Sequence, residues 1–230
     1  MSRSLFICFR LSLLCAVATV LPTALPAANA KKAGKQAAPG LKFRVQQLHL
    51  DNNEGCAIAD FDRDGHLDIS AGEFWHAGPG FTKKSAVRKL EVFGEDYLTN
   101  NSEHAYDVDG DGWKDIVSGS FRNTELSWYR NPGRDGLKSG AQWEKRLLID
   151  TQLSQNESTE LHDLDRDGTP ELVVSSYNQL NPFMAYKFSK DDAGKPVLEP
   201  WKIQNGGVMT NGHGLVAGKS GTHVLWNLGK

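Results

Sequence analysis

The sequence predicts an all-β protein, a partial β-propeller of about three four-stranded blades followed by an incomplete fourth. Three observations predict this fold. An acidic nine-residue segment occurs three times, each copy lies between short strand-like runs, and the copies recur at a regular period. Their first aspartates are Asp60, Asp107 and Asp163, so the copies lie 47 and then 56 residues apart. Repeat periods of about 50 residues are typical of propellers and related arrays.

The three acidic segments, residues 60–68, 107–115 and 163–171, share the pattern D-x-D-x-D-G-x-x-[DE]. Their carboxylates repel one another, since like charges about 4 Å apart cost on the order of 1 kcal/mol per pair even in water. Calcium would remove this repulsion, because it binds about six to eight oxygens and the glycine at position six lets the chain turn around it. Asp-Gly pairs also form ordinary turns, but three matching copies favour calcium. Magnesium is less favoured, because it prefers a smaller octahedral shell.

Within each segment, positions one, three, five and nine would contribute side-chain oxygens, and position seven a backbone carbonyl oxygen. We expect the bound ions to be structural, and no residue is assigned a catalytic or cofactor-binding role. The predicted metal-binding residues are Asp60, Asp62, Asp64, His66 and Asp68 in the first segment, Asp107, Asp109, Asp111, Trp113 and Asp115 in the second, and Asp163, Asp165, Asp167, Thr169 and Glu171 in the third.

The segments differ from the calcium loop of EF-hands. That loop needs a glutamate at position twelve and a helix on each side, whereas position twelve is Ala71, Ser118 or Val174 here. The residues that follow each segment are short apolar or β-branched runs ending in small residues, a pattern typical of strands. We therefore predict that each acidic segment is a loop joining two antiparallel strands.

The first thirty residues form a predicted signal peptide. Arg3 and Arg10 precede or flank an apolar run at residues 11–21, and Ala28-Asn29-Ala30 supplies a small-x-small cleavage pattern. The run is too short for a transmembrane helix, which needs about 20 residues. The sequence thus predicts a secreted or periplasmic protein without a transmembrane segment after cleavage, and residues 31–40 form a predicted linker.

The exported chain would be mildly acidic. Loss of the two leader arginines takes the formal net charge from −2 to −4, and no basic stripe that would favour nucleic-acid binding is present. Cys56 would be the only cysteine left, so an intramolecular disulfide is excluded. Because Cys56 lies in an apolar, strand-like stretch, we expect it to be a small core residue and not a nucleophile.

Aromatic segments and further strand candidates complete each repeat. Aromatic residues follow every acidic loop, and we expect the tryptophans to pack between blades, although Trp75, Trp113, Trp128 and Tyr129 could instead form a sugar-stacking platform. The strand candidates that precede or separate the loops are residues 42–50, 90–93, 143–149 and 201–203.

The loops and their flanks resemble the FG-GAP/VCBS repeats of secreted bacterial proteins, which are related to the calcium-binding propeller blades of integrin α-subunits. The resemblance rests on residues 59–69 and their two copies, together with the segment Trp128-Tyr129-Arg130-Asn131-Pro132-Gly133. It covers residues 41–200 and implies calcium-binding propeller blades. A well-formed Phe-Gly before each loop is absent from the sequence, so the VCBS variant fits better. The resemblance does not specify a function, because such blades occur in adhesins and in sugar-active enzymes.

Residues 201–230 form a predicted incomplete or degenerate repeat. Residues 211–218 resemble the strand that leads into an acidic loop, but the residues that follow, 219–223, contain no carboxylate. About seven blades close most propellers of this kind. Three interpretations remain open: a fragment of a longer propeller, an open array completed by a partner or by self-association through its unclosed edge, and a small ring of four blades.

Two functions remain open at this stage. The first is an exported, calcium-stabilised binding or adhesion module for a carbohydrate or a protein. The alternative is a sugar-active propeller enzyme of the lyase or dehydratase type, which would need a converging acid and base. The nearest candidates for these roles are not paired by their spacing: His76, His104, His162, His213, His223, Glu73, Glu103 and Glu160.

Overall fold

The computed structural model describes residues 42–94, 97–176, 183–201, 215–217 and 225–227. The predicted signal peptide, the linker and most of residues 201–230 lie outside these ranges. The chain divides into two units, residues 1–45 and 46–230, and all the elements below belong to the second. Within the described residues, no helix has the length and apolar character needed to cross a membrane.

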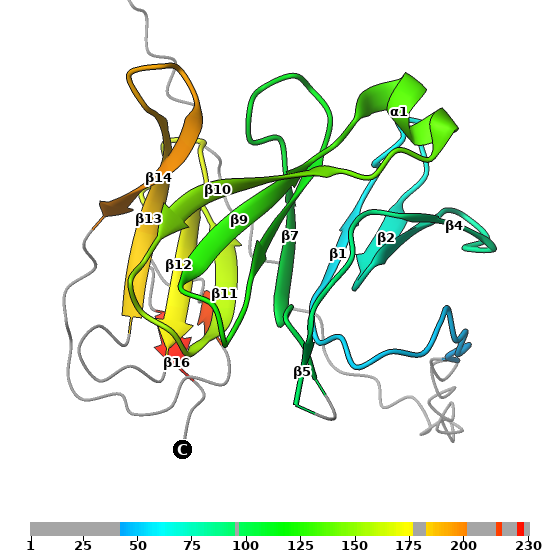
Figure 1. Ribbon diagram of the computed structural model, residues 1–230, viewed down its shortest axis with the longest axis horizontal. Coiled ribbons are helices and arrows are strands. Elements are labelled where there is room, and N and C mark those ends of the chain that lie inside the picture. The colour runs from blue at the N-terminus through cyan, green and yellow to red at the C-terminus, as the bar shows by residue number, and fades with distance from the viewer. Residues whose placement is uncertain (1–41, 95–96, 177–182, 202–214, 218–224, 228–230) are drawn as a thin grey trace, which may run out of the picture. The chain divides into compact units, whose positions relative to one another are not determined.

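Three four-stranded antiparallel sheets form the second unit, each built from consecutive strands (Figure 1). This confirms the predicted four-stranded blades. The first sheet contains β1 (Cys56–Ala59), β2 (Asp68–Ala71), β3 (Phe74–Ala77) and β4 (Lys83–Ala86). The second contains β7 (Ser102–Tyr106), β8 (Asp115–Gly119), β9 (Glu125–Arg130) and β10 (Glu144–Asp150). The third contains β11 (Asn156–His162), β12 (Glu171–Ser176), β13 (Phe183–Lys190) and β14 (Pro196–Trp201).

Two pairs of short strands and one short helix lie outside these sheets. β15 (Leu215–Ala217) pairs with β16 (Leu225–Asn227) in the region of the predicted incomplete fourth blade, and β5 (Val92–Phe93) pairs with β6 (Tyr97–Leu98). The helix α1 (Gly133–Ser139) follows β9 and ends where Gly140 adopts a left-handed φ of 71°. No helix was predicted here from the sequence, although a proline before the first turn and a glycine after the last are typical helix boundaries.

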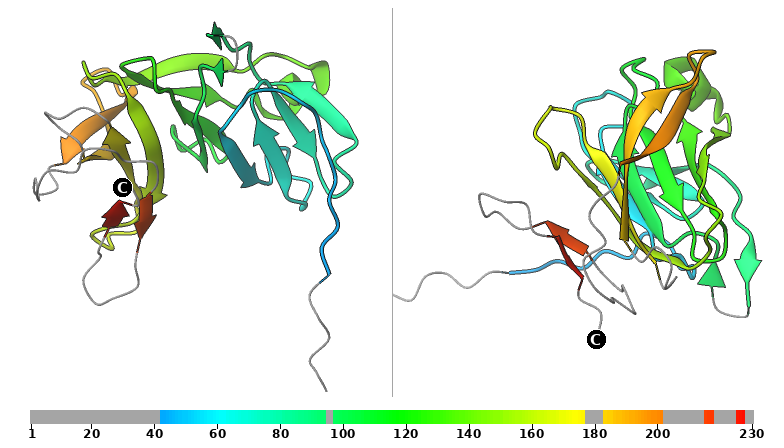
Figure 2. Two further views of the ribbon diagram at one scale, coloured as in Figure 1. Left: turned by 90° about the horizontal axis from the view of Figure 1, so that it is seen from below. Right: turned by 90° about the vertical axis from the view of Figure 1, so that its left-hand side faces the viewer.

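The sheets follow one another in chain order, with β1 in contact with β7 and β7 in contact with β11 (Figure 2). The middle strands are buried on both faces, since Ile116 of β8 packs toward the first sheet and its neighbour Val117 toward the third. Alternate residues of a strand point to opposite faces. Because both faces of β8 are covered, the residues that follow the second acidic loop form a continuous apolar run.

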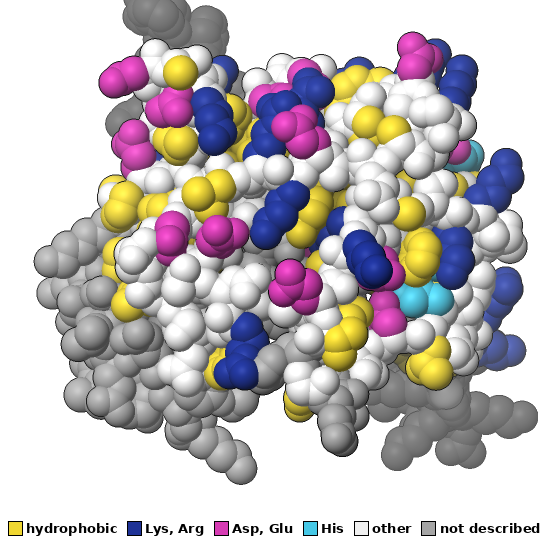
Figure 3. Space-filling view, viewed as in Figure 1, with side chains coloured by type: hydrophobic (Ala, Val, Ile, Leu, Met, Phe, Trp, Pro, Cys, Tyr) yellow, Lys and Arg dark blue, Asp and Glu magenta, His cyan; other side chains and the backbone are white. Residues whose placement is uncertain are grey.

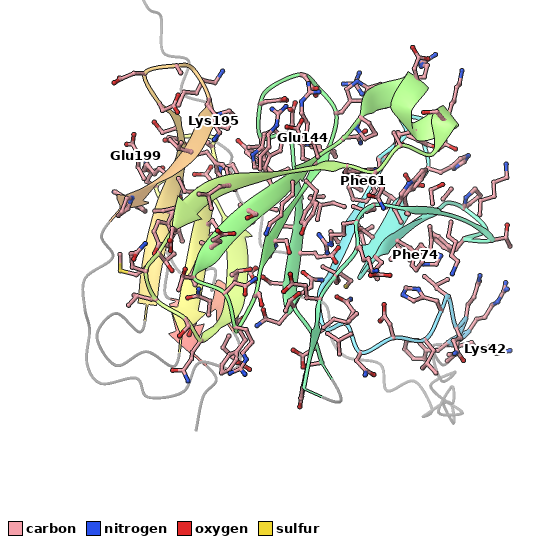
Figure 4. All side chains as sticks on the ribbon, viewed as in Figure 1. Lys42, Phe61, Phe74, Glu144, Lys195 and Glu199 are labelled. Atoms are coloured by element: carbon pink, nitrogen blue, oxygen red, sulfur yellow. The ribbon has the colours of Figure 1, made fainter. Side chains whose placement is uncertain are left out.

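Two apolar clusters fill the spaces between the sheets. Phe61 lies fully buried between the first two sheets (Figure 4), where its ring meets that of Trp143 edge-on at 5.7 Å. Trp128 is fully buried between the second and third sheets. Trp75 is also buried, so packing between blades is confirmed as the main role of these tryptophans. Since Trp75, Trp128 and Tyr129 are all buried, they do not form an exposed sugar-stacking platform.

A buried polar network joins the first two sheets beside the apolar cluster. Glu103 of β7 accepts hydrogen bonds from Ser70 of β2 at 2.6 Å and from Asn100 at 2.7 Å, and it forms an ion pair with Arg88. The Arg88 guanidinium also lies 4.4 Å from the centre of the Tyr129 ring. Glu103, one of the candidate acids in the sequence, is therefore part of the packing between sheets.

A second polar contact joins the second and third sheets. His104 of β7 lies 2.7 Å from the hydroxyl of Thr159 of β11 through its Nε2 atom. Burial lowers the pKa of His104 to about 4, because the charged imidazolium loses its water. His104 is thus neutral at physiological pH.

Two expectations from the sequence are wrong, and a third is only partly right. Residues 42–50 contain no strand. The candidate at residues 90–93 contains the short strand β5, which pairs with β6, and the fourth strand of the first sheet is β4. The turn after β3 returns the chain at once along the sheet, so β4 is complete before residue 90. Cys56 is exposed, because β1 alternates and buries Ala57 and Ala59 on the opposite face.

We predict that iodoacetamide labels Cys56 in the native protein, because its thiol lies on the exposed face of β1. Peptide mapping by mass spectrometry would locate the modified cysteine, with the Cys56→Ser variant as the control. Labelling that occurs only after denaturation would contradict this placement.

We also predict that His104 makes stability depend on pH. Its folded pKa of about 4 lies below its ordinary value of 6.5, so the unfolded chain binds more protons between these values. The contribution of the neutral His104 to the free energy of unfolding is present above pH 6.5 and is lost as the pH falls toward 4. Urea unfolding should show that the His104→Gln variant loses roughly 2–3 kcal/mol less free energy of unfolding than the unchanged protein as the pH falls through this range. The glutamine keeps a hydrogen-bond partner for Thr159. Equal losses in both proteins would contradict the prediction.

Candidate metal centres

Each acidic loop joins the first two strands of a sheet, as the sequence predicted. The three loops have the same register, because position nine pairs with the residue that precedes position one: Asp68 with Ala59, Asp115 with Tyr106, and Glu171 with His162. In every repeat, position nine is therefore the first residue of the second strand. The hairpin brings both ends of the acidic segment together.

The backbone turns sharply at positions four and six of each loop. Position six is glycine in all three copies, with φ of 89°, 88° and 93° at Gly65, Gly112 and Gly168. This left-handed region is costly for residues with a Cβ atom, which explains the repeated glycine. Position four is also left-handed, with φ of 58° at Arg63, 80° at Gly110 and 64° at Arg166.

Backbone amides hold the carboxylate at position one. In the first loop, Asp60 accepts hydrogen bonds from the N–H groups of Asp64 and Gly65 at 3.1 and 3.0 Å. Asp163 accepts the equivalent pair in the third loop, at 3.1 Å each. In the second loop the donors to Asp107 are the glycines at positions four and six, both at 2.9 Å. The first aspartate thus holds the turn closed.

The carboxylate at position nine is the most buried group of each loop, with an exposed fraction of 0% for Asp68 and Asp115 and 1% for Glu171. Each accepts a hydrogen bond from the backbone N–H of position two, at 2.8–2.9 Å. Asp68 and Asp115 accept a second one at 2.8 Å, from Gly78 and Asn131. These amides orient a carboxylate that has lost its water.

Positions one, three and nine converge in all three loops. One carboxylate oxygen from each position lies within 4.8 Å of the others, in the groups Asp60–Asp62–Asp68, Asp107–Asp109–Asp115 and Asp163–Asp165–Glu171. Three oxygens at this spacing match the hard ligands that a divalent cation such as calcium prefers.

The other predicted ligands do not join these groups. The aspartates at position five bond to the backbone N–H of position seven at 2.8–2.9 Å, and this contact shapes the end of the turn. The backbone carbonyls of position seven remain predicted ligands. The residues concerned are Asp64, Asp111 and Asp167 at position five, and His66, Trp113 and Thr169 at position seven.

Burial raises the pKa of the inner carboxyls. Loss of water raises the pKa of Asp115 to about 7, and it is also the main reason why the pKa of Asp68 is raised. The pKa of Asp62 is raised by burial and then by the neighbouring Asp64 and Asp60. Charged carboxylates are therefore costly here without a positive partner, and a bound cation would offset this cost.

Two of the loops have a basic side chain as such a partner. Arg130 of β9 contacts Asp109 and Asp111, both at 2.6 Å, and Lys187 of β13 contacts Asp165, Asp167 and Glu171. The ion pair with Asp165 is the main cause of the raised pKa of Lys187.

The first loop has no basic residue at the corresponding place. This place is defined by strand pairing: it is the residue of the third strand that follows the partner of the residue after position nine. In the second sheet it is Arg130, which follows Tyr129, the partner of Ile116. In the third sheet it is Lys187, which follows Tyr186, the partner of Leu172. Ile116 and Leu172 each come directly after position nine of their loops. In the first sheet the residue with this register is Ala77, which follows His76, the partner of Ile69. The first acidic group therefore differs from the other two.

The first and second loops are tied together. The side-chain amide of Asn131 donates to the carbonyl oxygens of Phe61 and Lys114 at 2.9 and 3.0 Å, and its backbone N–H donates to Asp115. Arg63 reaches the carbonyl of Gly112 and lies 4.6 Å from the ring centre of Trp113. The geometry of one acidic loop is thus linked to that of the next.

The sequence reading did not identify Arg130, Lys187 or Asn131 as parts of these sites. The segment around Arg130 and Asn131 was noted as a repeat feature, but its contacts with the acidic loops depend on the pairing of the second and third strands. A basic residue directly after a tyrosine of the third strand, Tyr129-Arg130 and Tyr186-Lys187, was the available signal in two of the three repeats.

Comparison with known proteins agrees with this architecture. A comparison with curated proteins found no match. Residues 107–174 match the family model described as an FG-GAP-like repeat, and this range contains the second and third acidic loops together with β8 to β11 and most of β12. The chain therefore carries an FG-GAP-like repeat over residues 107–174.

Proposed function

We propose that the protein is an exported, calcium-stabilised binding module, whose ligand is a carbohydrate or another protein. The observation that carries this proposal is the threefold recurrence of one donor arrangement. Each loop presents three converging carboxylate oxygens, one of them from a fully or almost fully buried residue. The FG-GAP-like repeat and the leader-like first thirty residues support a binding role outside the cytoplasm.

Calcium would act mainly on stability. With about 1 mM calcium and dissociation constants of about 10⁻⁵–10⁻⁴ M, binding to the folded state alone stabilises it by roughly 1.4–2.7 kcal/mol per site. Three such sites would contribute several kcal/mol, which is comparable with the whole stability of an ordinary domain. The contribution matters here because the exported chain has one cysteine and no intramolecular disulfide.

The loops are well placed to transmit this stabilisation to the core. Position two of each loop follows the first carboxylate directly and is apolar: Phe61 and Val108 are buried and Leu164 is partly buried. The N–H of the same residue bonds to the carboxylate at position nine. A cation that holds positions one, three and nine together therefore also fixes an apolar side chain between the sheets.

We predict that calcium raises the melting temperature and that EDTA lowers it. For a domain of this size about 1 kcal/mol corresponds to about 2–4 °C, so saturating all three sites should raise the melting temperature by roughly 10 °C or more. Differential scanning calorimetry measures both effects. An unchanged melting temperature would refute the calcium proposal.

Matched substitutions in one loop separate a metal ligand from a residue of the turn. We expect Asp68→Asn to reduce the increase in melting temperature caused by calcium, because Asp68 belongs to the converging group. Asp64→Asn should leave most of this increase intact, because Asp64 lies outside that group. The measured quantity is the difference with and without calcium, so a general loss of stability in Asp68→Asn does not affect the result. Equal increases in melting temperature with calcium in the two variants would contradict the assignment of Asp68 as a metal ligand.

We further predict that Lys187 competes with calcium in the third loop. Its ammonium group contacts all three carboxylates at positions three, five and nine, so a divalent ion must displace it. Isothermal titration calorimetry should show several-fold tighter calcium binding for one site in Lys187→Met. The Ala77→Lys variant, which places an ammonium at the same register in the first sheet, should weaken another site. Unchanged affinities in both variants would contradict the competition.

A further inference from the structure

A cavity of about 400 Å³ lies beside the first acidic loop. We name it the β4–α1 pocket. Its volume falls in the range of small-molecule sites, about 300–1,000 Å³. The residues that line it come from the first loop, from β3 and β4, and from α1: Asp62, Trp75, Ala77, Lys83, Ser85, Arg134, Leu137 and Lys138.

The strand register explains one wall of this pocket. Trp75 pairs with Ser85 and Ala77 pairs with Lys83, so these four side chains share one face of the first sheet. The opposite wall is α1, where Arg134, Leu137 and Lys138 have the i, i+3, i+4 spacing of a single helical face. Two regular elements thus hold the lining residues in place.

The pocket is rich in positive charge. Lys83, Arg134 and Lys138 are exposed, and none of them forms an ion pair with any carboxylate in the described part of the chain. Lys and Arg side chains gather along the edge of the molecule that carries β4 and α1 (Figure 3). Three cations around one cavity without internal partners favour an anionic ligand.

The remaining lining is suited to a ligand with both hydroxyl groups and an apolar face. Trp75 is largely buried, with an exposed fraction of 6%, and it adds aromatic surface to the lining. Ser85 adds a hydroxyl, while Ala77 and Leu137 add apolar surface. A hydroxyl next to apolar surface suits a ring that carries both polar groups and C–H groups.

The pocket lies beside the only one of the three acidic groups that has no basic residue at the register of Arg130 and Lys187 in the third strand. Ala77 has the register of Arg130 and Lys187, and Ala77 itself lines the pocket. Asp62 belongs to both the acidic group and the pocket lining. Without a cation, Asp62 would repel an incoming carboxylate, whereas a bound divalent ion would neutralise it.

We infer that the β4–α1 pocket binds a carboxylated sugar of the uronic acid type, in a calcium-dependent manner; this rests on the proposed function, because it identifies the ligand of the binding module. The cations hold the carboxylate, Ser85 meets a ring hydroxyl, and the apolar lining packs against the C–H face of the ring. A uronic acid carries all three features on one ring. An acidic peptide side chain offers only the carboxylate.

The inference is tested by calorimetric titration of the full-length protein with trigalacturonate in calcium. The methyl-esterified trisaccharide is the matched ligand without charge. We expect binding of trigalacturonate, at least fivefold weaker binding of the ester, and a similar loss on replacing calcium with EDTA. The variants Arg134→Gln and Lys138→Gln should each weaken binding at least threefold, because both residues line the pocket.

Lys195→Gln is the matched control, since Lys195 is an exposed cation between β13 and β14, outside the pocket (Figure 4). It should leave the affinity unchanged. Equal binding of sodium sulfate or of an acidic peptide would overturn the sugar assignment. No binding of trigalacturonate by a protein whose melting temperature rises with calcium would overturn the pocket proposal alone. Binding without any effect of calcium on stability would instead refute the calcium proposal and the dependence on Asp62.

Discussion

The structure depends most on a carboxylate that is buried at the start of the second strand of each four-stranded sheet. Asp68, Asp115 and Glu171 have almost no exposed surface, yet each lies within a group of three acids. Backbone amides supply part of the compensation, because each carboxylate accepts a hydrogen bond from the residue after the first aspartate. The rest must come from positive charge, and the three repeats differ in its source. Arg130 and Lys187 supply it in the second and third loops.

This charge balance is coupled to the packing of the sheets. The loops lie at the ends of the first two strands, and their second residues enter the apolar clusters that hold neighbouring sheets together. Polar contacts also join these elements. The buried Glu103–Arg88 pair joins the first two sheets, and Asn131 joins the first two loops. Removing one partner of a buried pair leaves an uncompensated charge, which costs more than the pair contributes. The interface between sheets therefore tolerates little change at these positions.

Much of the fold could be predicted from the sequence, because the acidic repeat marks the same hairpin three times. The acidic turns with short apolar flanks predicted the antiparallel hairpins, and the repeat period with its further strand candidates predicted the four-stranded sheets. The errors have local causes. Cys56 was placed in the core because its neighbours are apolar, but β1 alternates and only one of its faces is buried. The strand expected at residues 90–93 is only β5, outside the first sheet, because Lys83–Ala86 already pairs with β3.

The candidate sites were only partly predictable. The carboxylates at positions one, three and nine converge because the hairpin register brings both ends of the loop together, and this register follows from the repeat. Arg130, Lys187 and Ala77 could not be related to the loops from sequence alone, because their role depends on the pairing between the second and third strands. The lining of the β4–α1 pocket depends on α1, which lies beside β3 and β4 although these strands come much earlier in the chain.

The buried asparagines have a consequence for how the protein can be produced. Asn100 and Asn156 both begin an N-x-S sequence, the acceptor motif for N-linked glycans, but their exposed fractions are 1% and 3%. The amide of Asn100 contacts Glu103, and that of Asn156 contacts the carbonyl of Leu153 at 3.1 Å. A glycan on either nitrogen would have to replace these contacts with a bulky, hydrated chain. A eukaryotic secretory host, which attaches glycans before folding is complete, would therefore block the assembly of the sheets, whereas a bacterial host without this modification avoids the conflict.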